Sequence, residues 1–150
     1  MGRCSALTAR YSVGKLGVED YARCLLLVTA WREARGDGRD AMRAVAHVIK
    51  NRADVWGGGL IHQITSKNQF SSMTVLGDTQ TVLWPDATDA VNLADVINRV
   101  ADNFDPDPTG GALYYANLAT ENSKWFKEEI IAKPESHPIT IVIGKQTFFK

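Results

Sequence analysis

Two apolar segments in close succession, CLLLVTAWREARG at residues 24–36 and MRAVAHVIKNR at residues 42–52, decide the fold of this chain. The first is strongly apolar, which indicates a buried helix. In the second, the apolar residues recur at the i, i+3, i+4, i+7 spacing of one helix face: Met42, Val45, Ala46 and Ile49. The sequence therefore predicts two long helices packed against each other.

The ends of these helices follow from capping rules. The first helix is predicted to begin at Val18 or Glu19 and to end at Gly36, which can take a left-handed conformation. Asp37 is then predicted to cap the second helix, with Asp40 as its partner in a capping box. The second helix should stop near Asp54, before three glycines.

The rest of the chain alternates short elements with loops. Pro85 and Asp86 should begin a third long helix, and Tyr114 and Tyr115 fall in a short strand. The other expected elements are a polar loop at 68–72, a rigid loop at 105–111, a short helix at 123–132 and a hairpin of strands 139–143 and 147–149. The predicted class is α+β and mainly helical, with a small antiparallel sheet toward the C-terminus, in one domain over residues 1–150.

Composition excludes several classes of function. The 17 basic and 17 acidic residues balance, which argues against a nucleic-acid-binding protein with a basic face and against attraction to anionic membranes. The apolar run 22–31 is too short for a membrane span, so no membrane insertion is expected. Arg3 and Arg10 interrupt any apolar signal core, and we expect synthesis in a cytoplasm without a signal peptide. Cys24 is expected to be a buried free thiol rather than a partner of Cys4.

Glu33 is the residue whose position in the sequence most clearly suggests a catalytic role. A carboxylate at the end of one buried helix, facing another, is poorly solvated, which raises its pKa. Such a carboxyl group can hold a proton at neutral pH and give it to a glycosidic oxygen. Spacing alone favours the ordinary alternative, an exposed Glu paired with a neighbouring arginine: Arg32, Arg35 or Arg39.

Five segments in this order resemble the SleB-like cell wall hydrolases, a family named for a spore-cortex lytic enzyme and also found as bacteriophage lysis proteins. They are EARGD at 33–37, AVAHVIKNR at 44–52, QFS at 69–71, DPTGGALYYAN at 107–117 and IGKQTFF at 143–149. The resemblance spans roughly residues 20–150. It implies a lysozyme-like fold, no cofactor, and cleavage of the peptidoglycan glycan strand between N-acetylmuramic acid and N-acetylglucosamine, with Glu33 as the catalytic acid.

Two positions depart from the family pattern, which usually has Glu at Asp37 and His at Gln146. No proton transfer is expected from Gln146, and a direct role for Asp37 is weakened. Asp37 and Asp40 remain the candidate second acids, although both are well explained as caps. Hydrolysis normally needs two carboxylates, whereas a lytic transglycosylase reuses one Glu as acid and base, leaving a 1,6-anhydro product. The sequence slightly favours transglycosylation over muramidase hydrolysis.

The remaining site residues are expected to bind sugar. Gln69, Phe70 and Ser71 supply amide, apolar and hydroxyl groups, the chemistry of a saccharide site. Tyr115 and Asn117 share one face of the strand, with the Tyr hydroxyl aimed at Glu33 or the sugar and the Asn amide suited to an N-acetyl group. The alternatives are a surface loop anchored by a buried Phe70, and tyrosines that belong to the core or its rim.

Other aromatic and imidazole side chains are less informative. Three tryptophans that could stack on sugars are left unassigned: Trp56, Trp84 and Trp125. The three histidines show no metal-ligand spacing, so no metal site is expected: His47, His62 and His137. His47, within the second helix, is expected to be a hydrogen-bonded interior histidine.

These features favour a monomeric phage endolysin that reaches the cell wall after a separate holin-type protein opens the membrane. Its partner would be the peptidoglycan glycan strand. One alternative is a non-catalytic phage structural or glycan-binding protein that kept the fold. A wall hydrolase that cleaves peptide bonds is another.

Overall fold

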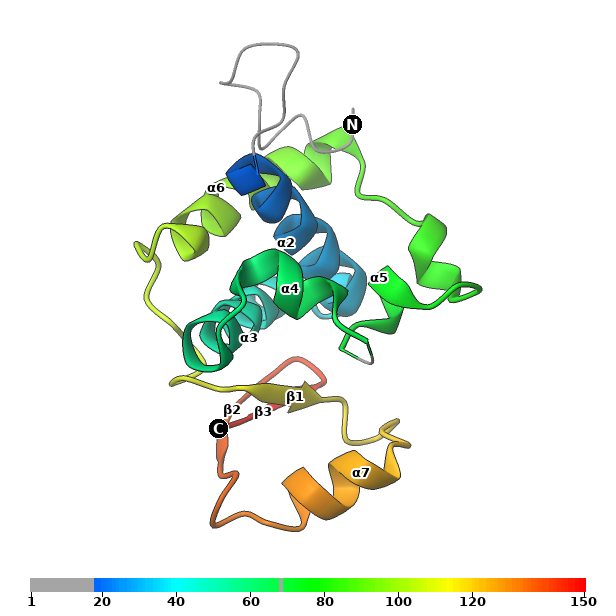
Figure 1. The fold of residues 1–150 in the computed structure, drawn as a ribbon, viewed down its shortest axis with the longest axis vertical. Coiled ribbons are helices and arrows are strands. Elements are labelled where there is room, and N and C mark those ends of the chain that lie inside the picture. The colour runs from blue at the N-terminus through cyan, green and yellow to red at the C-terminus, as the bar shows by residue number, and fades with distance from the viewer. Residues whose placement is uncertain (1–17, 68) are drawn as a thin grey trace.

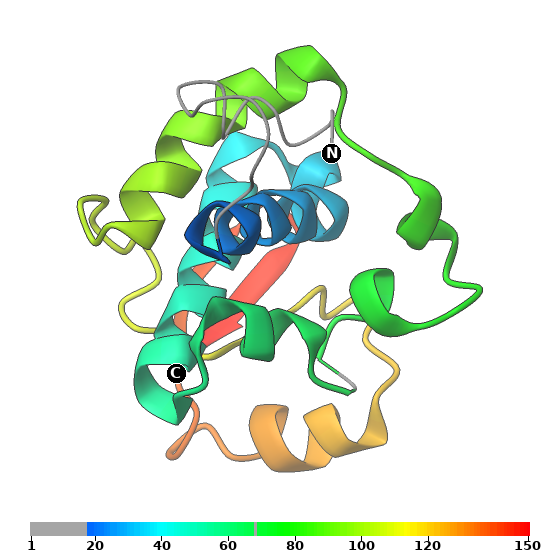
Figure 2. The same ribbon diagram turned by 45° about the horizontal axis from the view of Figure 1, so that its top comes forward.

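The computed structural model describes residues 18–67 and 69–150, and helix α2 (Val18–Ala34) lies at its centre. Four other helices contact α2 and surround it in Figures 1 and 2: α3 (Arg39–Trp56), α4 (Gly59–Thr65), α5 (Ser71–Thr74) and α6 (Ala87–Ala101). A helix with neighbours on several sides needs apolar residues around most of its circumference. This explains why the segment after Ala22 is apolar without a clear polar face.

The break between α2 and α3 differs from the prediction. Residues Arg35–Asp37 form a single 3₁₀ turn (η2), and Gly38, rather than Gly36, takes the left-handed conformation with φ +89°. Gly38 also occupies the N-cap position, so the predicted Asp37 cap is wrong. The Asp37 carboxylate instead accepts hydrogen bonds from the Lys145 amide and Gln146 Nε2, each at 3.1 Å.

Asp37 and Gln146 are the two positions at which the chain departs from the pattern of the family it resembles, and they are hydrogen-bonded to each other. Together they tie the start of α3 to the turn of the C-terminal hairpin. Gln146 is buried, so this contact is made at the edge of the core.

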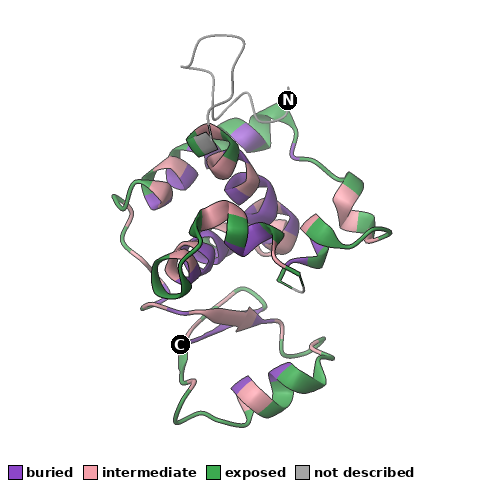
Figure 3. Ribbon diagram, in the orientation of Figure 1, coloured by how far each residue is buried: buried purple, intermediate pink, exposed green. Residues whose placement is uncertain are grey.

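The main core lies between α2 and α3, where buried residues concentrate in Figure 3. The predicted apolar face of α3 is confirmed, since Val45, Ala46 and Ile49 are fully buried, and Met42 packs against the core from its edge. The prediction for Cys24 is wrong because Cys24 is disulfide-bonded. Cys4 and the rest of residues 1–17 lie outside the described residues.

The predicted sheet is confirmed. Strands β1 (Tyr114–Ala116), β2 (Ile139–Ile143) and β3 (Gln146–Phe149) form an antiparallel sheet in the order β1-β3-β2. Gly144 lies in the β2–β3 turn with φ +59°. The class is therefore α+β and mainly helical, with a small antiparallel sheet, as predicted.

Helix α7 (Lys124–Phe126), which continues as a π-helical turn at Lys127–Ile131 (η4), packs beside the sheet on the side away from α3 (Figure 1). A second, smaller apolar cluster joins it to the sheet and contains Ala116, Phe126, Ile130 and Phe149. This confirms the predicted short helix at 123–132.

The rigid loop at 105–111 is held against α3. Asp105 Oδ2 lies 2.6 Å from Arg43 Nε and 2.7 Å from His47 Nε2, and Asp107 accepts a hydrogen bond of 2.9 Å from Asn51 Nδ2. The interior, hydrogen-bonded histidine predicted at position 47 is thereby confirmed.

The region between α4 and α6 is more ordered than predicted. The expected polar loop at 68–72 gives way at Ser71 to α5, and a 3₁₀ turn follows at Thr79–Val82 (η3). Asp86 caps α6 by accepting a hydrogen bond of 2.8 Å from the Asp89 amide, as expected for the start of the third long helix. No helix of the described part of the chain is long and apolar enough to cross a membrane.

Candidate active site

Three elements converge on the carboxylate of Glu33, which lies in the last turn of α2. Its Oε1 accepts a hydrogen bond of 2.8 Å from Ser72 Oγ on α5. Its Oε2 accepts one of 3.1 Å from the hydroxyl of Tyr115 on β1. The predicted bond between the tyrosine hydroxyl and Glu33 is present, and both carboxylate oxygens are held in place.

The environment of Glu33 raises the pKa of its carboxyl group above the ordinary value. Burial is the largest cause, because a poorly solvated carboxylate is disfavoured in its charged form. The hydrogen bonds from Ser72 and Tyr115 oppose this shift, as does the charge of Arg52, while the charge of Asp78 adds to it. The result is a carboxyl group that keeps its proton to a higher pH than a solvated Glu, as predicted.

Asp78 is the acidic residue whose charge acts on Glu33, and the sequence reasoning missed it. Its own pKa is lowered by hydrogen bonds from the Gln80 amide and the Ser71 side chain. A raised pKa at Glu33 and a lowered pKa at Asp78 are the pattern expected of a paired acid and base. Asp78 follows Gly77 in a segment for which the sequence predicted no element, so no local pattern marked it.

The two candidate second acids lie elsewhere. Asp37 bonds to the hairpin turn, and Asp40 is exposed in the first turn of α3. Neither is among the groups that shift the pKa of Glu33. Asp78, rather than either of these, is the acidic residue whose charge raises the pKa of Glu33.

Arg52 supplies a positive charge to the site and was also missed. Its buried guanidinium donates from Nε to the Leu113 carbonyl at 2.7 Å and from Nη1 to Gln69 Oε1 at 3.2 Å. Burial lowers the pKa of Arg52, and the charge of Glu33 opposes that shift. The residue lies in the AVAHVIKNR segment, which the sequence analysis treated as part of the second helix and of the family motif, with no separate role for Arg52.

Arg32 holds the segment that carries Ser72. Its guanidinium donates to three backbone carbonyls: Ser72 at 2.7 Å, Thr81 at 3.0 Å and Leu83 at 2.9 Å. It also lies over the Trp84 ring, 4.9 Å from the centroid. Arg32 is therefore a positioning residue, because it fixes the hydroxyl that bonds to Glu33.

The predicted sugar-binding residues differ in their exposure and in their contacts. Gln69 is exposed and contacts Arg52, and Ser71 is exposed but bonds to Asp78. Phe70 is 2% exposed and belongs to the core, so its ring offers no face to a sugar, and the buried-anchor alternative is the correct one. Asn117 follows β1, half-buried, and its Oδ1 accepts a hydrogen bond of 3.1 Å from the Ala119 amide.

A family model described as cell wall hydrolase matches residues 36–149. The chain belongs to the cell wall hydrolase family. It is thus an enzyme that acts on peptidoglycan, and the resemblance read from its sequence is confirmed. The match begins at Gly36, so Glu33 itself lies just before the matched segment, and its assignment depends on the geometry described above.

Two solved structures are similar to this cell wall hydrolase over most of its length. The catalytic domain of the germination-specific lytic transglycosylase SleB from Bacillus anthracis is 28% identical with a TM-score of 0.63, over 93% of this chain and 100% of that one. The catalytic domain of the Bacillus cereus SleB protein is 30% identical with a TM-score of 0.61, over 93% and 94%. No curated protein matches the chain.

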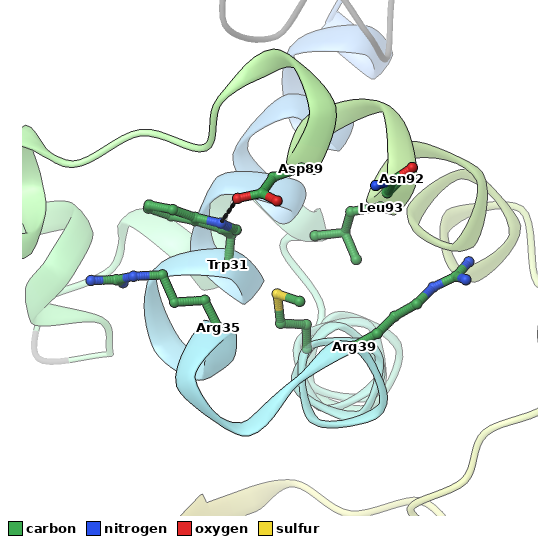
Figure 4. A pocket seen from close by; sticks show the side chains of 7 residues that line it. Trp31, Arg35, Arg39, Asp89, Asn92 and Leu93 are labelled. Carbon is green, nitrogen blue, oxygen red and sulfur yellow. Dashed lines mark hydrogen bonds between the residues drawn. The ribbon is translucent and has the colours of Figure 1, made fainter.

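The hydrolase also has a pocket of about 370 Å³ between α2, α3 and α6, shown in Figure 4. Trp31 Nε1 donates to Asp89 Oδ2 at 3.3 Å there, and the Arg35 guanidinium lies 4.4 Å from the centroid of the Trp31 ring. Residues two positions apart on a helix point to nearly opposite sides. Glu33 therefore faces away from this pocket, which is separate from the site.

The donor groups of the site do not suit a metal ion. Across residues 18–67 and 69–150, no three His, Cys, Asp or Glu side chains are grouped so that they could hold one.

Proposed function

We propose that this enzyme cleaves the peptidoglycan glycan strand between N-acetylmuramic acid and N-acetylglucosamine, with Glu33 as the general acid. One observation supports this above the others. The Glu33 carboxyl group has a raised pKa and is held at both oxygens, by Ser72 and Tyr115. A general acid needs this combination of a retained proton and a fixed position.

The preferred reaction is lytic transglycosylation, in two proton transfers through Glu33. Glu33 first protonates the glycosidic oxygen as the bond from muramic C1 to that oxygen breaks, and the bonding electrons leave with the oxygen. The resulting carboxylate then takes the proton of the muramic C6 hydroxyl, whose oxygen bonds to C1. The products are a 1,6-anhydromuramic end and a free N-acetylglucosamine end, and no water is consumed.

The surrounding groups support both protonation states of Glu33. Burial favours the protonated acid before bond cleavage, while the donors Ser72 and Tyr115 and the nearby charge of Arg52 favour the carboxylate formed by it. The Bacillus anthracis SleB catalytic domain, similar over 93% of this chain, is described as a lytic transglycosylase, which supports the same route here.

Hydrolysis is the second candidate, and Asp78 is the observation that favours it. An ionised carboxylate near a protonated one could activate a water molecule, as in glycosidases that use two carboxylates. Both hydrogen bonds to Asp78 come from its own segment, Gln80 and Ser71, which is also what a purely structural turn residue would show.

Mass spectrometry of fragments released from purified peptidoglycan separates these reactions. The wild type should release 1,6-anhydromuramic ends, Glu33→Gln should release none, and Asp78→Asn should give the same product as the wild type. Reducing muramic ends released by the wild type would establish hydrolysis instead, and their loss in Asp78→Asn would make Asp78 the second carboxylate. No glycan cleavage by the wild type would refute the proposed function and favour a non-catalytic or peptide-cleaving protein.

In the cell, we place this activity in a phage endolysin that reaches the wall after a holin-type protein opens the membrane. The resemblance to a family that includes phage lysis proteins supports this role. Expression inside bacteria should leave the turbidity of the culture unchanged until a membrane-permeabilising agent is added, and lysis should then be rapid. Lysis without permeabilisation would contradict a dependence on a release partner.

A further inference from the structure

An aromatic surface lies next to the Glu33 site, formed by Trp56, Tyr114, Trp125 and His137. The Tyr114 ring is at its centre, with ring centroids 5.8 Å from Trp56, 6.4 Å from Trp125 and 5.3 Å from His137. These residues come from the end of α3, from β1, from α7 and from the loop before β2. Four separate segments thus bring their rings to one place.

The two tryptophans of this aromatic surface are open to solvent, Trp56 being 43% and Trp125 57% exposed. Tryptophan is among the residues that folding tends to bury, and exposed apolar groups that gather in one place usually mark a binding site. Neither ring is needed to fill the small cluster under α7, which consists of Ala116, Phe126, Ile130 and Phe149.

Arg52 connects the aromatic surface with the catalytic carboxylate. Its guanidinium carbon lies 5.4 Å from the centroid of the Trp56 ring and 5.9 Å from that of Tyr114. The charge of the same guanidinium acts on Glu33, and its Nη1 donates to Gln69. Tyr114 and Tyr115 are adjacent in β1 and therefore point to opposite faces of the strand. Arg52 is thus the residue that links the aromatic surface to the Glu33 site.

We propose that the aromatic surface binds the glycan strand beyond the cleaved bond, with sugar rings packed on Trp56 and Trp125. This rests on the proposed function. Sugars present flat CH faces edged by hydroxyl groups, and indole and phenol rings offer apolar faces with one polar edge group each. The Arg52 guanidinium beside these rings already donates to Leu113 and Gln69. The exposed rings therefore offer mainly aromatic faces, which suit the CH faces of sugar rings better than an acidic peptide.

The test measures binding of peptide-free glycan strands to Glu33→Gln protein, so that the strands stay intact. Trp125→Ala and Trp56→Ala, each added to Glu33→Gln, should weaken the dissociation constant roughly tenfold. Phe104→Ala is the matched control, since Phe104 is an exposed aromatic residue, 79% open, that follows α6. It should bind as tightly as Glu33→Gln alone. In the active enzyme, Trp125→Ala should raise KM for long strands more than it lowers kcat.

A purely structural role for Trp125 would show as a lower Tm in Trp125→Ala and as recovery of both Tm and binding in Trp125→Leu, which fills similar space without an aromatic face; under the proposal, Trp125→Leu restores Tm but not binding. Tryptophan variants that bind strands like Phe104→Ala would overturn the proposal. So would a loss of binding confined to free stem peptides. The binding assay needs no turnover, so its result is independent of the product analysis. If the wild type cleaves glycan strands but the tryptophan variants bind them normally, only the binding role of the aromatic surface is refuted. If the wild type does not cleave glycan strands, the proposed function is refuted.

Discussion

The Tyr115 hydroxyl donates a hydrogen bond of 3.1 Å to Glu33 Oε2 across 82 positions of sequence. Burial is the main cause of a pKa for Tyr115 well above the usual value, and the charge of Glu33 raises it further. The hydroxyl therefore keeps its proton to a higher pH than a solvated tyrosine does, and it donates that proton to the hydrogen bond that orients the Glu33 carboxylate.

Replacing Glu33 by Gln should remove nearly all glycan cleavage while the protein stays folded. The amide has the shape of the carboxyl group but carries no transferable proton, and general acid catalysis contributes about 10²- to 10⁴-fold. Loss of turbidity of permeabilised cells, together with circular dichroism, measures activity and folding. Lysis by the variant at the wild-type rate would show that another residue is the acid.

The pKa of Glu33 also sets a pH dependence. Its folded pKa lies above its ordinary value of 4.5, so the first proton transfer requires a form that is lost as the pH rises through the folded pKa. The specificity constant for cleavage, kcat/KM, should therefore fall as the pH rises through the folded pKa of Glu33, which gives the pH profile an alkaline limb. A profile with no alkaline fall in the acidic-to-neutral range would argue against a protonated Glu33 as the reactive form.

The same shift affects stability. In the folded protein Glu33 binds its proton more tightly than in the unfolded chain, so its contribution is fully present below pH 4.5 and is lost as the pH rises through the folded pKa. Glu33→Gln does not titrate. Its free energy of unfolding, relative to the wild type, should therefore be higher at pH 7 than at pH 4. Denaturant titrations at the two pH values measure this, and equal differences would contradict a raised pKa.

Tyr115→Phe should lower activity by up to about 100-fold, because the carboxylate loses one of its two orienting bonds. Since that bond lowers the pKa of Glu33, its removal should also move the alkaline limb of the rate profile to higher pH. Ser72→Ala should shift the limb in the same direction. An unchanged limb in both variants would indicate that the hydrogen bonds are not maintained during catalysis.

Arg32→Met should destabilise the protein by roughly 3 kcal/mol, because three backbone carbonyls lose their donor. It should also reduce cleavage, since Ser72 is released from its position. Arg39→Met is the control: Arg39 is exposed, in the first turn of α3, and the change should leave Tm and activity unaltered. Equal effects of the two substitutions would show that Arg32 has no special role.

Asp37→Ala should cost about 1–2 kcal/mol of stability, because it removes both hydrogen bonds to the hairpin turn. Gly144→Ala should act at the same contact, since its new Cβ would lie 2.9 Å from Asp37 Cβ at a φ of +59°. Asp37→Asn should retain cleavage. A loss of activity as large as that of Glu33→Gln, without unfolding, would make Asp37 a catalytic acid.

Local patterns predicted the elements but not their contacts. The apolar face of α3 and the C-terminal hairpin depend on spacing within a few residues, and both are found as expected. The predicted caps at Asp37 and Gly36 are wrong. Asp37 bonds instead to Gln146, far along the chain, and this contact outweighs the local preference of Asp for a helix cap. Two cysteines likewise contain no local signal that separates a thiol from a disulfide.

The site itself could be predicted only in part. Glu33 and Tyr115 followed from burial, strand alternation and the family resemblance, and the structure brings them together. Ser72, which bonds to Glu33, was not among the predicted residues; it lies on α5, in a segment predicted to be a polar loop. Arg52 and Asp78 act on Glu33 through long-range packing, for which one sequence offers no pattern.

The strand order β1-β3-β2 has a consequence for when the enzyme becomes active. Tyr115 belongs to β1, and β1 is bound to the sheet through β3, whose Phe148 lies opposite it. Glu33 and Tyr115 both precede this partner strand in the chain, so β1 can pair only after residues 146–149 have been made. Assembly of the site therefore waits for β3 to fold onto β1.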